Sequence, residues 1–299
     1  MILTEAKTSE KPKGITMEVV YRYFSTSRQG YAQQVKRRKA EDEFFHLMSE
    51  EVIEYRSNVD CRAGSRSLYY NLSIKEKYLI GVTKFERLMS VHEMTMRVVK
   101  VRIVTTKSDC RSWNYTNLIQ GRVLTGINQA ICGDITYLKV DMEVYYIFTL
   151  FDLFSGKCVG LYGSKRMRKQ EAIKTLEQFK KLRSANEIEG SVHHTDGGSQ
   201  YFSNSYRKMV GDSKMKISVA KTCLENGFAE QKNAILKHHF LPTKNSGSES
   251  KIQKSLITIK DDYNNRKQYG LRWLSPNEVE TQLKTGELKD KNRQMASFE

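Results

Sequence analysis

No stretch of the sequence approaches the roughly 18 consecutive apolar residues of a membrane-spanning helix, which excludes an integral membrane protein. The first residues, MILTEAKTSEKPKG, are polar and of mixed charge, so we expect no secretory signal. Internal repeats are lacking, and low-complexity sequence is confined to a Ser/Gly stretch at residues 245–250. These absences predict a soluble protein of the cytoplasm.

Cysteines are few, and their spacing argues against cysteine-based stabilisation. They are Cys61, Cys110, Cys132, Cys158 and Cys223. Their number is odd and no CxxC pair occurs, which excludes a disulfide framework and a zinc ribbon. The residues that could form a two-histidine, two-cysteine zinc site are too far apart in sequence: His46, Cys61, His92 and Cys110. We expect small buried thiols in a reducing compartment.

Acidic residues are the minority among charged residues: 34 Asp and Glu stand against 50 Lys and Arg, a formal net charge of +16. The surplus is +8 over residues 1–128, +5 over residues 129–240 and +3 over residues 241–299. No segment has the combined amphipathic and basic pattern of a helix that lies on an anionic membrane. Nucleic acid is therefore the favoured partner.

The first third of the chain has the pattern of helices joined by polar turns. After an expected flexible tail over residues 1–15, apolar periodicity predicts helices over Met17–Phe24 and Glu41–Tyr55. Between them, Ser25 or Ser27 can cap the helix that follows. These features predict an all-α region over residues 16–96.

A further short helix is predicted within Gly81–Met89, with Thr83 as its N-cap and an apolar stripe on one face. Short helices joined by turns that carry Gly are typical of helix-turn-helix DNA-binding units. The basic side chains expected to contact phosphates are Lys36, Arg37, Arg38, Lys84 and Arg87. An ordinary helical domain with solvated charges is the alternative at this point.

The pattern changes beyond a basic, irregular linker over residues 97–128. Residues 129–242 alternate as β-β-β-α-β-α-β-α, which predicts a mixed sheet flanked by helices. The predicted strands are Ile131–Val140, Tyr145–Phe151, Lys157–Tyr162, Gly190–His194 and Lys216–Val219. Residues 243–299 are expected to form a C-terminal helical extension.

Three acidic residues occupy informative places in this order. Asp134 is within the first strand, Asp196 follows the fourth strand, and Glu230 is in the first half of the last helix. An Asp inside an apolar strand is costly unless its charge is compensated, and a divalent cation compensates several carboxylates that converge. On these residues alone, surface or capping carboxylates remain the alternative.

The last predicted helix has two distinct faces. Asn226, Glu230 and Lys237 share one face because they are spaced by four and seven residues. A second face is apolar and suited to packing on the sheet; it contains Ala229, Leu236 and Phe240. Lys237 is therefore placed to contact a phosphate beside Glu230.

Several sequence blocks resemble, in the right order, those of the OrfB-type transposases of the IS-three insertion-sequence family, whose catalytic core is similar to retroviral integrase. The blocks are GDITYL at 133–138, FDLFSGKCVG at 151–160, HTDGGSQY at 194–201, ENGFAE at 225–230 with Leu236 and Lys237, YNNR at 263–266 and LSPNE at 274–278. The resemblance implies an RNase H-like α/β core preceded by the helix-turn-helix region.

The resemblance also implies the residues of the site. The catalytic and metal-binding triad would be Asp134, Asp196 and Glu230, holding two Mg²⁺ ions, with Mn²⁺ as a substitute. Gln200 and Tyr201 would shape the pocket for the DNA end, and Lys237 would contact that end. Asp152 is a further candidate for a metal-binding acid, but a turn-forming role accounts for it without a metal.

The implied function is a DNA transposase that cleaves and joins strands at terminal inverted repeats of a mobile element. Its partners would be double-stranded DNA, both repeat and target, a second copy of itself in at least a dimer, and an upstream OrfA protein. A nucleoid-associated place in the bacterial cytoplasm follows. The alternatives are a catalytically silent DNA-binding regulator, or domesticated relative, and an RNase H-type nuclease.

This sequence departs from the family pattern near the site. The step from Asp196 to Glu230 is 34 residues, two fewer than is usual in the family, and the shortening falls within Ser218–Leu224. Gly227 replaces an Ala, which adds flexibility near the helix start. A Trp before Asp134 is missing as well. The triad is intact, but whether the enzyme is fully active stays open.

Overall fold

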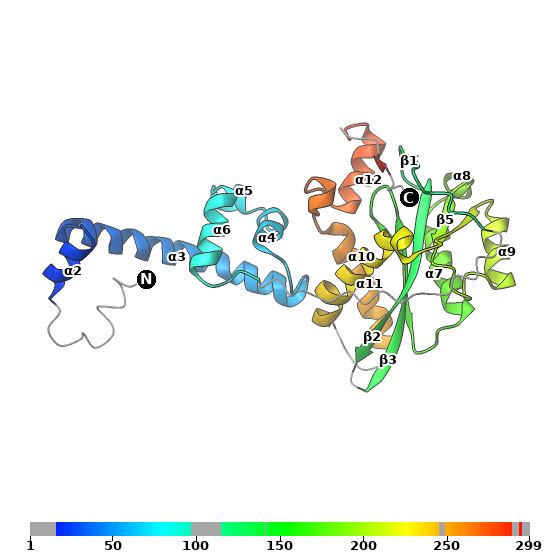
Figure 1. Ribbon diagram of the computed structural model, residues 1–299, viewed down its shortest axis with the longest axis horizontal. Coiled ribbons are helices and arrows are strands. Elements are labelled where there is room, and N and C mark those ends of the chain that lie inside the picture. The colour runs from blue at the N-terminus through cyan, green and yellow to red at the C-terminus, as the bar shows by residue number, and fades with distance from the viewer. Residues whose placement is uncertain (1–15, 97–114, 141, 245–248, 289–292, 295–299) are drawn as a thin grey trace. The chain divides into compact units, whose positions relative to one another are not determined.

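A computed structural model describes residues 16–96, 115–140, 142–244, 249–288 and 293–294 of the chain. The expected tail at residues 1–15, most of the linker, including Cys110, and part of the Ser/Gly stretch lie outside the described residues. The chain divides into two compact units, Met1–Glu54 and Tyr55–Glu299. Figure 1 shows the helices and strands with their labels.

The first unit contains α2 (Met17–Tyr23) and most of α3 (Arg28–Asn58). As predicted, Ser27 precedes a helix, and its hydroxyl accepts a hydrogen bond from the N–H of Gly30 at 3.0 Å. The expected separate helix Glu41–Tyr55 is instead the second half of α3. The basic run between the two halves consists of strong helix formers, so it continues the helix rather than interrupting it.

Three further helices follow in the second unit: α4 (Ser65–Asn71), α5 (Ile74–Tyr78) and α6 (Val82–Val91). The predicted apolar stripe of α6 is buried; it consists of Phe85, Leu88 and Met89. The predicted cap is wrong, because Gly81 occupies the N-cap position and Thr83 lies one residue inside the helix. The Tyr69 hydroxyl donates to the Ile80 carbonyl at 3.0 Å and so joins α4 to the start of α6.

A five-stranded sheet forms the centre of the second unit, with the order β4-β3-β2-β5-β6. Its strands are β2 (Ala130–Val140), β3 (Glu143–Asp152), β4 (Cys158–Ser164), β5 (Val192–Thr195) and β6 (Lys216–Val219). β3 is antiparallel to β2 and β4, whereas β5 is parallel to β2 and β6. This confirms the predicted mixed sheet of an RNase H-like core.

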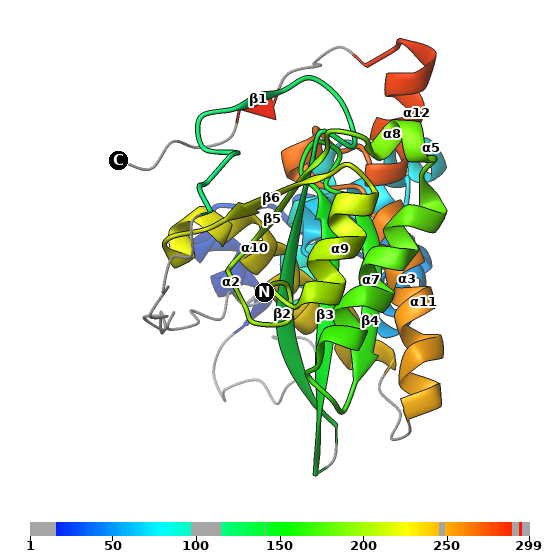
Figure 2. The same ribbon diagram turned by 90° about the vertical axis from the view of Figure 1, so that its right-hand side faces the viewer.

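Helices cover both faces of this sheet. One face packs on α7 (Lys169–Leu182), α8 (Ala185–Ile188) and α9 (Asn204–Asp212), and Figure 2 shows α7 and α9 side by side. The other face packs on α10 (Gly227–Ile235), α11 (Glu249–Asn265) and α12 (Pro276–Thr285). Successive strand side chains point to opposite faces, so Ile131 joins the first cluster and Cys132 the second.

The segments between and beyond these helices are short. A 3₁₀ turn, η1 (Cys223–Asn226), leads into α10, and a π-helical turn, η2 (Leu236–Phe240), follows it. A second 3₁₀ turn, η3 (Leu241–Lys244), precedes α11, and a third, η4 (Tyr269–Leu271), follows it. β1 (Val123–Leu124) pairs with β7 (Arg293–Gln294).

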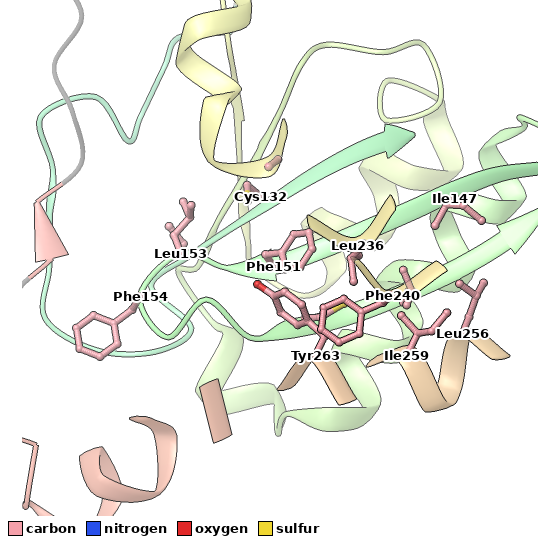
Figure 3. Close-up of a cluster of buried hydrophobic side chains, with 14 of the residues drawn as sticks. Cys132, Ile147, Phe151, Leu153, Phe154, Leu236, Phe240, Leu256, Ile259 and Tyr263 are labelled. Carbon is pink, nitrogen blue, oxygen red and sulfur yellow. The ribbon is translucent and has the colours of Figure 1, made fainter. Parts of the chain in front are cut away.

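The core includes more of the chain than the predicted residues 129–242. Ile119 and Leu124, from the expected linker, are buried in the same cluster as the sheet. Six residues of the expected C-terminal extension are buried there too: Ile252, Leu256, Ile259, Tyr263, Val279 and Leu288. Figure 3 shows Tyr263 against Phe151 and Phe240, with ring centroids 5.6 Å and 5.9 Å apart. α11 is therefore part of the core.

This packing predicts the stability of two variants in α11. We expect Leu256→Ala to lower the free energy of unfolding by about 2–5 kcal/mol, because it removes a buried side chain and leaves a cavity. The matched control Ile257→Ala, at a side chain that is 62% exposed, should change it by less than about 0.5 kcal/mol. Chemical denaturation of both variants measures the difference. Equal effects would mean that α11 does not belong to the core.

Two remaining predictions concern membranes and cysteines. Among the described residues, no helix is long and apolar enough to cross a membrane.

Cys61, Cys132 and Cys158 are free thiols, and the last two are buried, as predicted.

Candidate active site

The parallel pairing of β2 with β5 brings two of the predicted acids together. Gly133 of β2 is in register with Thr195, the last residue of β5. The residues that follow them along the chain are Asp134, within β2, and Asp196, just beyond β5. The two carboxylates therefore come from adjacent strands at the same level of the sheet. Gly133 allows this close packing, because a Cβ there would lie 3.0 Å from a Leu150 methyl group and 3.2 Å from the His193 ring.

Asp134 faces α10, and its carboxylate has a fixed partner there. The Asn233 amide donates to Asp134 Oδ2 at 2.8 Å, and the Thr149 hydroxyl on β3 lies 2.8 Å from Asn233 Oδ1. Because an amide has one donor end and one acceptor end, this pair of contacts orients Asn233. One oxygen of Asp134 is held, and the side chain is kept in one position.

The electrostatics of Asp134 show that the three predicted acids are neighbours. Burial, together with the negative charges of Asp196 and Glu230, raises the pKa of Asp134 from 3.8 to about 7. Protonation, or a cation, relieves the repulsion among these carboxylates. The site is thus one in which a positive charge is favoured.

Asp196 lies just beyond β5, where the backbone turns at Gly197 with a φ of +82°. The residue reaches solvent, yet the surrounding protein still excludes enough water that burial raises the pKa of its carboxyl. Its Oδ1 accepts the N–H of Gly198 at 3.1 Å. The left-handed backbone at Gly197 suits glycine and directs the chain away from the strand end.

Glu230 is in the first turn of α10 and is exposed to solvent. Ala229, the residue before it, is fully buried against the sheet, so α10 presents Glu230 beside the strand ends. Within the described residues, no three His, Cys, Asp or Glu side chains form a ready cage for a metal ion. The arrangement instead fits Mg²⁺, which needs only one or two carboxylates and takes its other ligands from water and substrate.

The predicted DNA-contact residues of the core differ in their surroundings. The Lys237 ammonium lies 4.0 Å from the centre of the Tyr137 ring, which is 52% exposed and three residues from Asp134 along β2. The Gln200 amide donates to the Met167 carbonyl at 3.3 Å. Lys237 and Gln200 are both half-buried.

Tyr201 is predicted to shape the pocket for the DNA end, but its ring is only 4% exposed. It packs against His193 and Tyr206, at centroid distances of 5.8 Å and 5.4 Å. Burial lowers the pKa of His193 to about 3, so this cluster is uncharged and apolar in character. Tyr201 supports the strand end from inside and has no surface to offer a DNA end.

The basic side chains predicted on the helical segments lie mostly at the surface. Lys36 and Arg37 on α3 and Lys84 and Arg87 on α6 are exposed, and Arg38 is half-buried.

Asp152 has the turn-forming role that the sequence predicted. Its carboxylate is fully buried and accepts the N–H groups of Phe154 and Ser155 at 3.0 Å and 2.7 Å, as well as that of Asn128 at 2.7 Å. These bonds close the turn between β3 and β4 and leave no role for a metal.

The sequence reasoning missed Asn233 and Thr149 as parts of the site. Asn233 is three residues after Glu230, which puts both on neighbouring positions of one helix. This spacing could have identified Asn233 from the sequence. Thr149 could not have been identified in this way, because only the antiparallel register of β2 and β3 sets it opposite Asp134.

The chain is similar in sequence to an integrase family and to several transposases. Residues 125–223 match the family described as integrase core domain. The transposase for insertion sequence element IS629 of Shigella sonnei is 26% identical over 208 residues, covering 68% of both chains. Transposase InsF for insertion sequence IS3A of Escherichia coli strain K12 is 33% identical over 110 residues, covering 36% of this chain and 37% of that protein.

A further relative is the uncharacterized 31 kDa protein of insertion element IS600 from Shigella sonnei, 28% identical over 228 residues, with 72% of this chain and 82% of the relative covered. Among solved structures, the HTLV-2 integrase catalytic core domain in complex with magnesium matches 55% of this chain and 99% of its own, with 20% identity and a TM-score of 0.41.

Proposed function

We propose that this chain, whose residues 125–223 match the integrase core domain and which is similar to insertion-sequence transposases, cleaves and joins DNA strands at the terminal inverted repeats of a mobile element. The observation that supports the chemistry is the raised pKa of Asp134, which is caused by burial together with the nearby charges of Asp196 and Glu230. Such a group of carboxylates is suited to hard divalent cations.

The proposed metal-binding residues come from three different parts of the fold. Asp134, Asp196 and Glu230 would hold two Mg²⁺ ions, with Mn²⁺ as a substitute. Bound there, the ions would lower the pKa of the attacking water or 3′-hydroxyl and stabilise the leaving oxygen. Asn233 keeps one oxygen of Asp134 engaged, so the carboxylate does not have to be ordered again when substrate arrives.

The proposed DNA contacts are of two kinds. Lys237 and Gln200 would contact the end of the repeat beside the carboxylates, while Lys36, Arg37, Arg38, Lys84 and Arg87 would hold the flanking duplex through phosphates. Pairing two ends of the element requires at least a dimer, and target DNA is the second substrate. An OrfA protein is a further proposed partner.

The experiment is nicking of a labelled terminal-repeat duplex in Mg²⁺, repeated after chelation of the metal and after its return. We expect specific nicking at the 3′ ends of the element that disappears with chelation and returns with the metal. Tight binding without nicking in Mg²⁺ or Mn²⁺ would favour a catalytically silent regulator.

DNA binding itself should depend steeply on salt, because neutralised phosphates release counterions. We expect Lys84→Ala and Arg87→Ala each to reduce the slope of log affinity against log salt by about one, with similar losses for specific and random duplexes. Titrations between about 50 and 200 mM salt measure the slope. A loss of sequence preference with an unchanged slope would instead assign these residues to base contacts.

A further inference from the structure

His194 joins the two segments that carry Asp196 and Glu230. It is fully buried at the end of β5, two residues before Asp196. Its Nδ1 lies 2.8 Å from the Ser218 hydroxyl on β6, and its Nε2 lies 3.2 Å from the carbonyl oxygen of Glu225 in η1. Glu225 is five residues before Glu230, so one imidazole spans the gap between the two acidic segments.

The direction of each hydrogen bond in this group can be deduced. The Glu225 carbonyl can only accept, so Nε2 of His194 carries the proton and donates. Burial lowers the pKa of His194 to about 4, so the ring is neutral near pH 7 and its Nδ1 accepts. The Ser218 hydroxyl therefore donates to Nδ1 and accepts the Leu118 N–H, which lies 2.8 Å away. All four groups are satisfied.

The side chain of Glu225 closes the same loop from its other side. One carboxylate oxygen accepts the Lys221 N–H at 3.0 Å and the Asn117 amide at 2.7 Å. The side-chain oxygen of Asn117, Oδ1, in turn accepts the N–H groups of Ile119 and Gln120 at 3.0 Å and 3.1 Å. The loop from β6 to α10 is thus held at Glu225 through both its backbone and its side chain.

The start of α10 lacks support of its own. Its N-cap, Asn226, makes no capping hydrogen bond through its side chain, and the first helical residue is Gly227. An uncapped start with a glycine is the weakest kind of helix N-terminus, and Glu230 is only three residues further on. The position of Glu230 consequently depends on what holds the loop in front of it.

We propose that His194 is a positioning residue that sets the separation of Asp196 and Glu230 by holding the Glu225 carbonyl at the entrance to α10. The proposal rests on the proposed function, since it concerns the same carboxylates.

The test compares His194→Phe with His193→Phe in the full-length protein. His194→Phe keeps the volume of the ring and removes both hydrogen bonds. His193→Phe makes an equivalent change at the adjacent buried histidine, whose Nε2 contacts the Tyr206 hydroxyl at 3.2 Å and not the loop. The measured quantities are Mn²⁺ affinity of metal-free protein by electron paramagnetic resonance, affinity for a terminal-repeat duplex, and the Mg²⁺ concentration at half-maximal nicking.

We expect His194→Phe to weaken Mn²⁺ binding and to raise the half-saturating Mg²⁺ by about 10- to 100-fold, the usual cost of losing a group that orients metal ligands. DNA affinity should stay within about twofold, and His193→Phe should bind Mn²⁺ as the unaltered protein does. Should His194→Phe fail to fold, His194→Gln and Ser218→Ala serve instead. His194→Gln should keep a donor for the Glu225 carbonyl. It should therefore lose less Mn²⁺ affinity than the double variant that combines His194→Gln with Ser218→Ala.

Unchanged Mn²⁺ affinity in His194→Phe, or an equal loss in His193→Phe, would overturn the proposal. Either result would leave nicking by the unaltered protein intact and hence the proposed function standing. If the unaltered protein neither binds Mn²⁺ nor nicks DNA, the proposed function fails and this inference fails with it.

Discussion

Asp196→Asn is expected to reduce Mg²⁺-dependent nicking of a terminal-repeat duplex by on the order of 10³-fold or more, with DNA affinity unchanged or improved. The substitution keeps the shape of the side chain and removes its charge. A neutral amide is a poor ligand for a hard cation, and the stabilisation of charge at the reacting phosphate is lost with the ion. Binding should not suffer, because the lost negative charge would otherwise repel phosphate.

The matched control is Asp212→Asn, at an exposed acid at the end of α9 that lies outside the proposed site. It removes one negative charge from the same domain and should nick DNA at the rate of the unaltered protein. Equal activity in both variants would show that Asp196 is not catalytic. If the unaltered protein binds tightly without nicking, addition of an OrfA protein decides between a missing partner and a silent regulator.

Asp134→Asn is expected to make the metal-free protein more stable at pH 8 and to have no such effect near pH 4. In the folded protein the pKa of Asp134 is about 7, above its ordinary value of 3.8. Between these values the folded state binds more protons than the unfolded state, so stability falls as pH rises through this window. Asn cannot ionise, and the variant escapes that loss.

The measurement is the melting temperature of both proteins at pH 4, 6 and 8 without divalent metal, and again at pH 8 with Mg²⁺. Mg²⁺ should stabilise the unaltered protein by mass action and should stabilise the variant much less. A variant that is less stable than the unaltered protein at pH 8 would contradict the raised pKa of Asp134. An equal response of both proteins to Mg²⁺ would place the ion elsewhere.

Most of the α/β architecture could be predicted from local pattern. Lys216–Val219 was predicted with its observed bounds, and the strand Ile131–Val140 differs from β2 by one residue. These strands are short apolar runs bounded by polar turns, so the burial of their side chains is evident without tertiary information. The turn-forming role of Asp152 was equally local, because two of its three backbone partners are two and three residues away.

Helix boundaries and domain limits were less accessible. The unbroken α3 was divided in two because the charged run in its middle carries no apolar residue that repeats with helical period. The ends of the core were set too narrowly, since residues 115–128 and α11 are joined to the sheet by contacts with distant parts of the chain. The apolar face of α11 does repeat with helical period, but that period does not show on which part of the chain the face packs.

The sequence by itself determined the order of strands and helices, the excess of basic charge and the three acids, because composition and periodicity act over a few residues. Only the tertiary structure decided that Asp134 and Asp196 share one level of the sheet, that Asn233 holds Asp134, that Tyr201 is buried, and that His194 reaches Glu225. Each of these depends on strand register or helix docking, in which a shift of one residue would turn the side chain to the other face.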